Sequence, residues 1–372
     1  MCGKELEYVQ DAFASNWIAP LGSYVNRFEK DICSYVGIQH AAALSSGTAA
    51  MHLALKIRGV KKGDYVICPS FTFSASANPV IYENAIPVFV DSETNTWNMD
   101  ANLLAEAIEF CIQKKNKKPA AIIVVHLYGM PANMHDIIIV SNKYEIPIIE
   151  DAAESLGSKY KDQYTGTFGV LNILSFNGNK IITTSGGGAL ISNNKDYIET
   201  AKFLATQARD KAPHYEHSQI GYNYRLSNIC AAIGVGQMTV LEERIQQRRN
   251  NFNTYSSALN DLNGISFLKE KTGYFSNRWL TTILIDETKT NGISNTDIRL
   301  QLEQQNIEAR PLWKPLHLQP VFKHHPKFVN GTSEKLFNSG LCLPSGSDLS
   351  QQNLTHIIAV IKSGLEPSKS LK

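Results

Sequence analysis

The chain has 372 residues, more than one ordinary hydrophobic core serves, and this length favours a large domain followed by a smaller one. Hydrophobic residues make up 43% and charged residues 19%, which excludes an intrinsically disordered chain. The 36 basic and 34 acidic residues nearly cancel, and the run of basic residues at 114–118 is typical of a solvated loop. We therefore expect no nucleic-acid partner.

The cysteines and the apolar runs of the sequence indicate the cell compartment of the protein. The six cysteines form no C-x-x-C pair and have no histidine at metal-ligand spacing, so they predict reduced, mostly buried thiols and no metal site. Apolar runs such as residues 120–125 are too short to cross a bilayer, and the first residues lack an apolar signal core. These features predict a cytoplasmic protein without a membrane partner.

Short apolar runs alternate with helical patterns through the first 240 residues. Strands are expected at residues 64–69, 86–91, 120–126 and 146–151, and helices at 49–57, 101–115 and 134–144. Apolar runs that end in polar residues are typical of parallel strands that are buried on both faces and carry functional groups at their carboxyl ends. The alternation predicts an α/β domain with a mostly parallel sheet over residues 1–240.

The pattern changes after residue 240. Residues 240–259 form a long polar helix pattern rich in Glu, Gln and Arg, which predicts a connector into a second domain. That domain, residues 241–372, is expected to be a smaller α+β unit with a strand at 279–285 and a helix at 296–305.

The first segment with functional chemistry is Leu-Ser-Ser-Gly-Thr-Ala-Ala-Met-His at residues 44–52. A turn of small residues opens a helix pattern here, and exposed amides at a helix start bind phosphate well. Gly47 permits close backbone approach, and Thr48 adds a hydroxyl. The same residues are also typical of a simple N-cap, so this segment alone does not decide between the two interpretations.

The second segment, residues 69–78, places Phe71 and Phe73 after a strand end among small residues. An aromatic ring here can stack on a flat heterocycle. We assign this role to Phe73 and expect Phe71 to lie in the core.

The third segment, residues 148–154, ends a buried strand with Asp151. A buried carboxylate needs a partner, and a cationic pyridinium nitrogen is one that keeps both groups ionised. The alternative is that Asp151 caps the following helix.

The fourth segment, residues 175–188, carries Lys180 after an Asn-Gly-Asn turn and before a run of glycines. Burial would lower the pKa of this lysine and make its amine a nucleophile, although a lone lysine is normally a surface residue. No P-loop motif is present. Together the segments give a phosphate turn, an aromatic stack, a strand-end aspartate and a lysine 29 residues later, which are the four parts that pyridoxal phosphate requires.

Five motifs in this order resemble the DegT/DnrJ/EryC1/StrS family of sugar aminotransferases. They are S-G-T-x-A at 46–50, P-S-F-T-F at 69–73, E-D-A-A at 150–153, S-F-x-x-x-K at 175–180 and G-Y-N-Y-R-L at 221–226. The resemblance covers nearly the whole chain, from residues 15–22 to 342–345. It implies a pyridoxal phosphate enzyme of fold type I, the aspartate aminotransferase-like fold.

The resemblance also implies a role for each matching residue. Lys180 would hold the cofactor as a Schiff base, and Asp151 would pair with the pyridine nitrogen. Phe73 would stack on the ring, and Glu154 would lie near its hydroxyl. The phosphate would be bound by residues of the first and fourth segments, with a contribution from the second subunit of a homodimer: Gly47, Thr48, Ala49, Ser175 and the partner-directed Asn223. Arg225 would lie next to that cross-subunit contact.

The finer resemblance is to transaminases of the bacillosamine pathway, on residues 175–188 and 308–320. It implies transfer of the amino group of glutamate to UDP-2-acetamido-4-keto-2,4,6-trideoxyglucose. Four residues would then lie near the nucleotide-sugar: Arg310, Trp313, Lys314 and His317. The alternative is that these four belong to a structural loop of the small domain.

Other functions stay open within the family. The acceptor can be another GDP- or dTDP-linked keto-sugar, or the chain can be a relative that binds the cofactor without turnover. Pyridoxamine-dependent dehydration is disfavoured, because relatives with that chemistry replace the lysine with histidine, whereas Lys180 is present. Relatives usually carry several residues before the segment that matches residues 3–6, so we expect a substrate contact from that arm to be missing.

Overall fold

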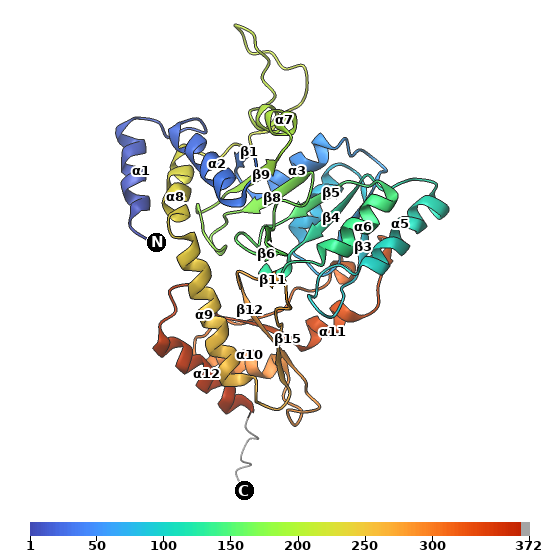
Figure 1. Ribbon diagram of the computed structural model, residues 1–372, viewed down its shortest axis with the longest axis vertical. Coiled ribbons are helices and arrows are strands. Elements are labelled where there is room, and N and C mark those ends of the chain that lie inside the picture. The colour runs from blue at the N-terminus through green and yellow to red at the C-terminus, as the bar shows by residue number, and fades with distance from the viewer. Residues whose placement is uncertain (366–372) are drawn as a thin grey trace.

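The computed structural model describes residues 1–365, and its centre is an eight-stranded sheet with the order β1-β9-β8-β5-β4-β2-β3-β14 (Figure 1). β9 is antiparallel to both of its neighbours, and the other strand pairs are parallel. The strands are β1 (His40–Leu44), β2 (Tyr65–Pro69), β3 (Ile86–Val90), β4 (Ala121–Val125), β5 (Ile148–Asp151), β8 (Leu171–Ser175), β9 (Gly188–Ser192) and β14 (Lys327–Phe328). The predicted, mostly parallel α/β sheet is confirmed.

Helices bury both faces of this sheet, because alternate side chains of each strand point to opposite faces. Ile123 of β4 packs in one core cluster and Ile122 in another, and both are fully buried. The helices of this part are α1 (Lys4–Ala14), α2 (Ser23–Val36), α3 (Gly47–Ile57), α4 (Asn78–Tyr82), α5 (Ala101–Lys115), α6 (Met134–Tyr144), α7 (Lys195–Ala205) and α8 (Asn228–Met238). The helices expected at 49–57, 101–115 and 134–144 are confirmed.

A long helix, α9 (Leu241–Leu259), leads into a second, four-stranded sheet with the order β10-β12-β15-β13 (Figure 1). Its strands are β10 (Ile265–Phe267), β12 (Thr281–Ile285), β13 (Arg310–Pro311) and β15 (Gly340–Leu343). The helices around it are α10 (Asn295–Gln304), α11 (Thr332–Ser339) and α12 (Gln351–Leu365). A third, small sheet has the order β11-β6-β7, formed by β6 (Lys159–Tyr160), β7 (Gln163–Tyr164) and β11 (Tyr274–Phe275).

The chain returns to the large sheet late in its course. β14 pairs in parallel with β3 at the sheet edge, and Phe322 packs in the same core cluster as Ile123. The division after residue 240 therefore stays a prediction, since a segment from the later half completes the first sheet. Within residues 1–365 no helix is both long and apolar enough to cross a bilayer.

Candidate active site

A cavity of about 330 Å³ lies where β5 and β8 end, at the carboxyl edge of the parallel strands. Eight of the residues predicted for the site line this cavity: Gly47, Thr48, Phe73, Asp151, Glu154, Ser175, Lys180 and Trp313. The fold therefore brings all four functional segments together. Further lining residues that the sequence did not single out include Ser76, Asn177, Asn179 and Trp279.

The start of α3 forms one wall of the cavity. Ser46 caps this helix, because its Oγ accepts a hydrogen bond of 3.0 Å from the backbone amide of Ala49. A Cβ on Gly47 would lie 3.2 Å from the Cβ of Ser175, so glycine permits the helix start and the end of β8 to meet closely. The positive end of the helix dipole thus faces the cavity at Gly47 and Thr48, as a phosphate site requires. Ala49 does not line the cavity in this chain, and its amide is bound to Ser46.

Asp151 ends β5 and reaches the cavity from the sheet. Burial raises the pKa of Asp151 above its usual value, while the Ser76 hydroxyl, the Ala153 amide and the Lys180 charge act in the opposite direction. Ser76 Oγ donates to Asp151 Oδ2 at 2.8 Å, and the Ala153 amide donates to Oδ1 at 3.2 Å. A cationic ring nitrogen next to this carboxylate would lower its pKa and stabilise both charges.

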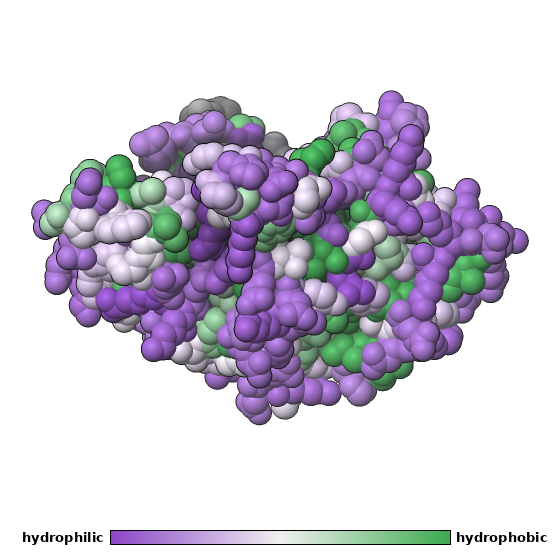
Figure 2. All heavy atoms as spheres, turned by 90° about the horizontal axis from the view of Figure 1, so that it is seen from above, coloured by the Kyte–Doolittle hydropathy of each residue, from purple (hydrophilic) through white to green (hydrophobic). Residues whose placement is uncertain are grey.

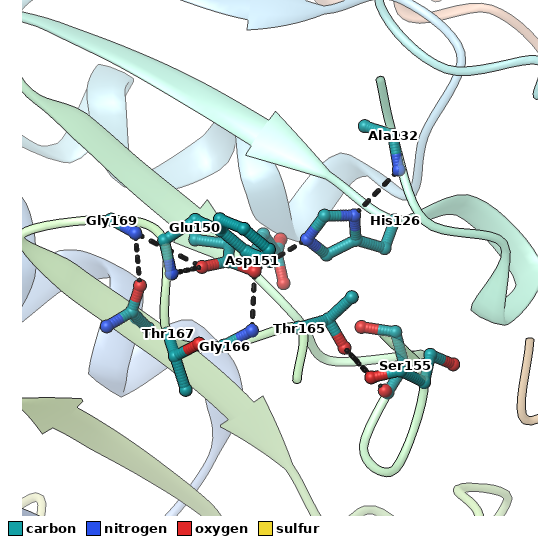
Figure 3. A network of polar contacts seen from close by, with 12 residues as sticks. His126, Ala132, Glu150, Asp151, Ser155, Thr165, Gly166, Thr167 and Gly169 are labelled. Atoms are coloured by element: carbon teal, nitrogen blue, oxygen red, sulfur yellow. Dashed lines mark hydrogen bonds and ion pairs between the residues drawn. The ribbon is translucent and has the colours of Figure 1, made fainter. Parts of the chain in front are cut away.

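A buried polar network supports the strand behind Asp151 (Figure 3). His126 Nε2 lies 2.6 Å from Glu150 Oε1, and His126 Nδ1 accepts from the Ala132 amide at 2.9 Å. This acceptor role at Nδ1 puts the ring proton on Nε2, which donates to Glu150. The same carboxylate accepts from the backbone amides of Gly166, Phe168 and Gly169. Its hydrogen-bonding capacity is filled by the protein, and β5 is fixed in place.

Glu154 supplies a second carboxyl group to the cavity. Burial raises its pKa to about 7, whereas the Lys180 charge and a hydrogen bond from the Tyr128 amide act to lower it. The Tyr128 amide donates to Glu154 Oε2 at 2.7 Å, and Tyr128 itself has a left-handed backbone, with φ 54°. The turn at Tyr128 therefore orients Glu154 toward the cavity.

Lys180 lies between these carboxyl groups and an aromatic ring. Burial lowers the pKa of its amine, Glu154 and Asp151 raise it, and Arg248 lowers it further. The Nζ atom lies 4.1 Å from the centroid of the Trp279 ring. The net effect of burial favours a neutral amine, the form that acts as nucleophile and base.

Two phenylalanines of the second segment have different environments. Phe73 lies at the cavity rim with 51% of its surface exposed, and its ring centroid is 5.4 Å from that of Trp313. Phe71 is 2% exposed and packs in the core with Tyr128, as we expected for it. An exposed ring at the rim is available to cover a flat ligand.

His317, predicted to contact substrate, is bound on both sides by residues of its own chain. Its side chain is fully buried, with Nδ1 2.6 Å from Ser70 Oγ and Nε2 3.0 Å from Glu334 Oε1. Both ring nitrogens are therefore used within the chain, and His317 lines neither cavity, so its contact with substrate stays a prediction.

Arg225 and Asn223 also lie away from the cavity lining. Arg225 Nη1 contacts Glu29 Oε1 at 2.8 Å and the Ala43 carbonyl at 3.0 Å, with 9% of the side chain exposed. This buried ion pair is a structural partner for Arg225. Asn223 is exposed on the surface, and its predicted contact with a second subunit stays a prediction.

A second cavity, of about 650 Å³, adjoins the first and shares Lys180, Trp279 and Trp313 with it. Arg310, one of the residues predicted near substrate, lines this cavity together with Arg244 and Arg248. Two carboxylates, Glu308 and Asp348, line the same cavity, and Arg310 pairs with Glu308, so part of this positive charge is already neutralised within the chain. Lys314 is exposed and lines neither cavity.

The model of the DegT/DnrJ/EryC1/StrS aminotransferase family matches residues 2–362, which include every residue that lines the first cavity. The chain belongs to this family. The sequence resemblance noted on five motifs is thereby confirmed. Transaminase activity follows from membership, since the lysine, the strand-end aspartate and the helix start are all in place.

Several proteins are similar over most of their length. EpsN of Bacillus subtilis (strain 168), provisionally named a pyridoxal phosphate-dependent aminotransferase, is 52% identical over 97% of this chain and 93% of its own. The GDP-perosamine synthase of Escherichia coli O157:H7 is 37% identical over 96% of this chain and 94% of its own. The UDP-4-amino-4,6-dideoxy-N-acetyl-beta-L-altrosamine transaminase of Campylobacter jejuni (strain 81-176) is 35% identical over 71% of this chain and 69% of its own.

Solved structures give the same fold. A DegT DnrJ EryC1 StrS aminotransferase from Brucella abortus has a TM-score of 0.90 at 30% identity, over 98% of this chain and 96% of its own. The PLP-form of Spr1654 from Streptococcus pneumoniae has a TM-score of 0.89 at 25% identity, over 98% of this chain and 96% of its own. The predicted fold type I is confirmed.

Pyridoxal 5′-phosphate, the cofactor predicted from the sequence, is the cofactor of this family, and the residues present fit it. Asp151 is a buried carboxylate at the cavity wall, and burial raises its pKa, so a cationic ring nitrogen beside it would stabilise its charged form. The helix start at Gly47 and Thr48 offers amides to a phosphate, and Lys180 offers an amine. When bound, the cofactor supplies an electron sink for the carbanion that forms during transamination.

Proposed function

We propose that this enzyme transfers the amino group of glutamate to C4 of a UDP-linked 4-keto-6-deoxy-N-acetylhexosamine, for the synthesis of a bacterial surface glycan or glycoprotein sugar. The observation that carries the proposal is the position of Lys180 on the wall shared by two cavities. One cavity has a helix start, a buried aspartate and a lysine, the groups that the cofactor requires, and the other has three arginines beside two carboxylates, where we place the nucleotide diphosphate. The lysine can therefore act on a donor or a sugar carbon at the junction.

The residues of this chain have distinct tasks in that reaction. With the cofactor bound, Lys180 Nζ would act as the base that takes the α-proton of glutamate and as the acid that gives a proton to C4 of the sugar. Asp151, held by Ser76, keeps the ring nitrogen protonated. Phe73 and Trp313 at the rim limit the access of water. Two half-reactions at one amine predict ping-pong kinetics.

Two observations support a UDP-linked N-acetyl sugar. Residues 175–188 and 308–320 resemble the bacillosamine-pathway transaminases, and the similar Campylobacter jejuni enzyme is named for a UDP-linked 4-amino sugar. Arg310 in the second of these segments lines the arginine-rich cavity.

A GDP-linked 4-keto-6-deoxyhexose is the second candidate acceptor. The GDP-perosamine synthase of Escherichia coli O157:H7 is 37% identical and matches 96% of this chain, a longer match than that of the UDP-sugar enzyme. Both candidate acceptors require the same chemistry at Lys180. They differ only in the protein groups that would recognise the nucleotide base and the substituent at C2 of the sugar.

The test is a panel of UDP-, GDP- and dTDP-linked 4-keto sugars with glutamate as donor, followed by mass spectrometry and NMR of the products. We expect amination of the UDP-linked N-acetyl sugar, no product with Lys180→Ala, and unchanged product with the surface control Lys195→Ala. Amination of the GDP-linked sugar alone would replace the first candidate by the second. A purified Lys180-intact protein that stays colourless with added cofactor would overturn both.

We also propose that the enzyme is a cytoplasmic homodimer whose subunits share the active site. Asn223 is exposed and does not line the cavity of its own chain, which is the arrangement expected of a residue that reaches a partner. Leu21 and Ile220 are exposed apolar side chains that a partner subunit would cover, and the face seen from above mixes hydrophobic patches with hydrophilic surface (Figure 2). Sedimentation velocity of the purified protein tests the proposed dimer.

A further inference from the structure

The turn that carries Lys180 is attached to a residue from the later half of the chain. Trp279 is 1% exposed, and its Nε1 donates a hydrogen bond of 2.7 Å to the carbonyl of Asn179. The face of the same indole lies 4.1 Å from Lys180 Nζ. One side chain therefore contacts both the backbone before the lysine and the amine at its end.

Arg248 of α9 forms a second connection between Trp279 and Lys180. Its guanidinium donates to the carbonyl of Trp279 through Nη1 and to the carbonyl of Lys180 through Nη2, the latter at 3.4 Å. Arg248 is buried, with 7% of its surface exposed. Helix α9 thus fixes the spacing between the indole and the lysine turn.

The residues before Trp279 hold the opposite wall of the cavity. The Trp279 amide donates to Asn277 Oδ1 at 2.9 Å, and Asn277 Nδ2 donates to the carbonyl of Glu154 at 3.1 Å. A single short segment, residues 277–279, therefore sets the position of Lys180 relative to the loop that follows Asp151.

We propose that Trp279 is a positioning residue for Lys180, whose indole face receives the free ammonium group and whose N–H fixes the turn that carries it. The proposal deepens the proposed function, since transamination requires the lysine to leave the cofactor and to return. Between those steps the amine needs a defined place inside the cavity. The ring face supplies it, because an aromatic quadrupole attracts a cation.

The charged groups around the Lys180 amine determine how strongly the Trp279 ring affects the pKa of that amine. Asp151 at the end of β5 and Glu154 after it attract the ammonium group, and Arg248 of α9 repels it. Burial lowers the pKa of Lys180, and the face of Trp279 opposes that effect by stabilising the charged form. Loss of the ring should therefore lower the pKa of the free amine further.

The test uses the full-length holoenzyme. Hydroxylamine captures the carbonyl of the cofactor and frees the Lys180 amine without any need for turnover. The amine is then labelled with isotopic acetic anhydride over a series of pH values, and mass spectrometry of the Lys180 peptide gives the midpoint of labelling. We expect Trp279→Leu to lower the midpoint by about 0.5–1.5 pH units and Trp279→Phe, which keeps a ring face, to retain most of the wild-type value. A midpoint that is unchanged or higher in Trp279→Leu overturns the proposal.

If Trp279→Leu does not fold, fluorinated tryptophan is incorporated in place of tryptophan, and it tests the same contact with Lys180. Ring fluorination weakens the cation–π attraction with little change in shape, so the midpoint should fall stepwise with the number of fluorines. The same fluorinated tryptophans, when incorporated into Trp279→Phe, should cause no such fall in the labelling midpoint of Lys180. A fall of equal size in that variant would assign the effect to another tryptophan and overturn the proposal.

A negative result of the labelling experiment can be distinguished from a failure of the proposed transaminase function. Glutamate bleaches the yellow band if the donor half-reaction occurs, whatever the labelling midpoint is. A protein that bleaches normally but shows no effect of Trp279 retains its function and loses this inference. A protein that never bleaches loses the function, while the labelling still reports on the contact between Trp279 and Lys180.

Discussion

His126 Nε2 lies 2.6 Å from Glu150 Oε1, and both side chains are fully buried next to the carboxyl end of β5. Removal of the carboxylate would leave the imidazole N–H and three backbone amides without their acceptor. We therefore expect Glu150→Ala to lower the free energy of unfolding by about 3–5 kcal/mol, as is typical when one partner of a buried pair is lost. Urea denaturation followed by circular dichroism measures this change.

The matched control for that variant is Glu199→Ala. Glu199 is an exposed residue of α7 that pairs with Lys195 at 3.4 Å. Exposed pairs contribute little, so the change should stay within about 0.5 kcal/mol. Equal effects of the two substitutions would show that the buried network does not stabilise the sheet.

Glu154 predicts a dependence of stability on pH. Burial raises the pKa of Glu154 to about 7, so the folded protein binds more protons than the unfolded chain between the usual glutamate value and about pH 7. Stability contributed by this group is present at low pH and is lost as the pH rises through that window. The wild type should therefore lose roughly 2–3 kcal/mol more than Glu154→Gln between pH 5 and pH 8.

Denaturation of the cofactor-free wild type and of Glu154→Gln at both pH values measures this difference. Asp151 and Lys180 interact with Glu154, so the difference between the two proteins measures Glu154 together with its effect on these two neighbours. Parallel loss of stability in the two proteins would contradict the assignment of the effect to Glu154.

The sequence predicted those parts of the site that depend on local structure. Thr48, Phe73 and Asp151 lie at a helix start or just after a strand end, and such positions follow from the pattern of apolar and small residues nearby. Because the carboxyl ends of parallel strands share one edge of a sheet, their meeting with Lys180 could be expected as well.

Contacts between distant parts of the chain could not be predicted in this way. Trp279 lies 99 residues beyond Lys180 and appeared only as the start of an ordinary strand pattern. β14 has two residues, too few for any periodicity, yet it completes the large sheet. His317 lies in the segment that resembles substrate-binding relatives, but Ser70 and Glu334 bind both of its nitrogens. In each case the deciding partner comes from a remote segment.

Gly188 tests the close packing under the start of α3. A Cβ at this position would lie 2.4 Å from the Gly47 amide nitrogen and from the Ser46 carbonyl carbon, so the backbone would have to move. Gly188→Ala should displace the start of α3 and weaken binding of the cofactor by about tenfold or more, in line with strain of 1–3 kcal/mol. Titration with pyridoxal phosphate, followed by absorbance, measures the dissociation constant. Gly178→Ala is the control, since its Cβ meets only the Ser185 carbonyl oxygen, at 3.9 Å, and cofactor affinity should not change.

Substitution of Arg225 tests whether this residue has a structural role or a role in substrate binding. Its guanidinium and the ammonium of Lys202 both contact Glu29, whose Oε1 also accepts from the Ala43 amide at 2.9 Å. Arg225→Met would leave this carboxylate with less charge compensation in a buried setting, and we expect a loss of about 2–4 kcal/mol of stability. Lys202→Met removes a more exposed partner and should cost less, about 1 kcal/mol. If Arg225→Met leaves the denaturation midpoint unchanged and raises only the KM for the nucleotide-sugar, Arg225 contacts the substrate, and the ion pair with Glu29 does not explain its presence.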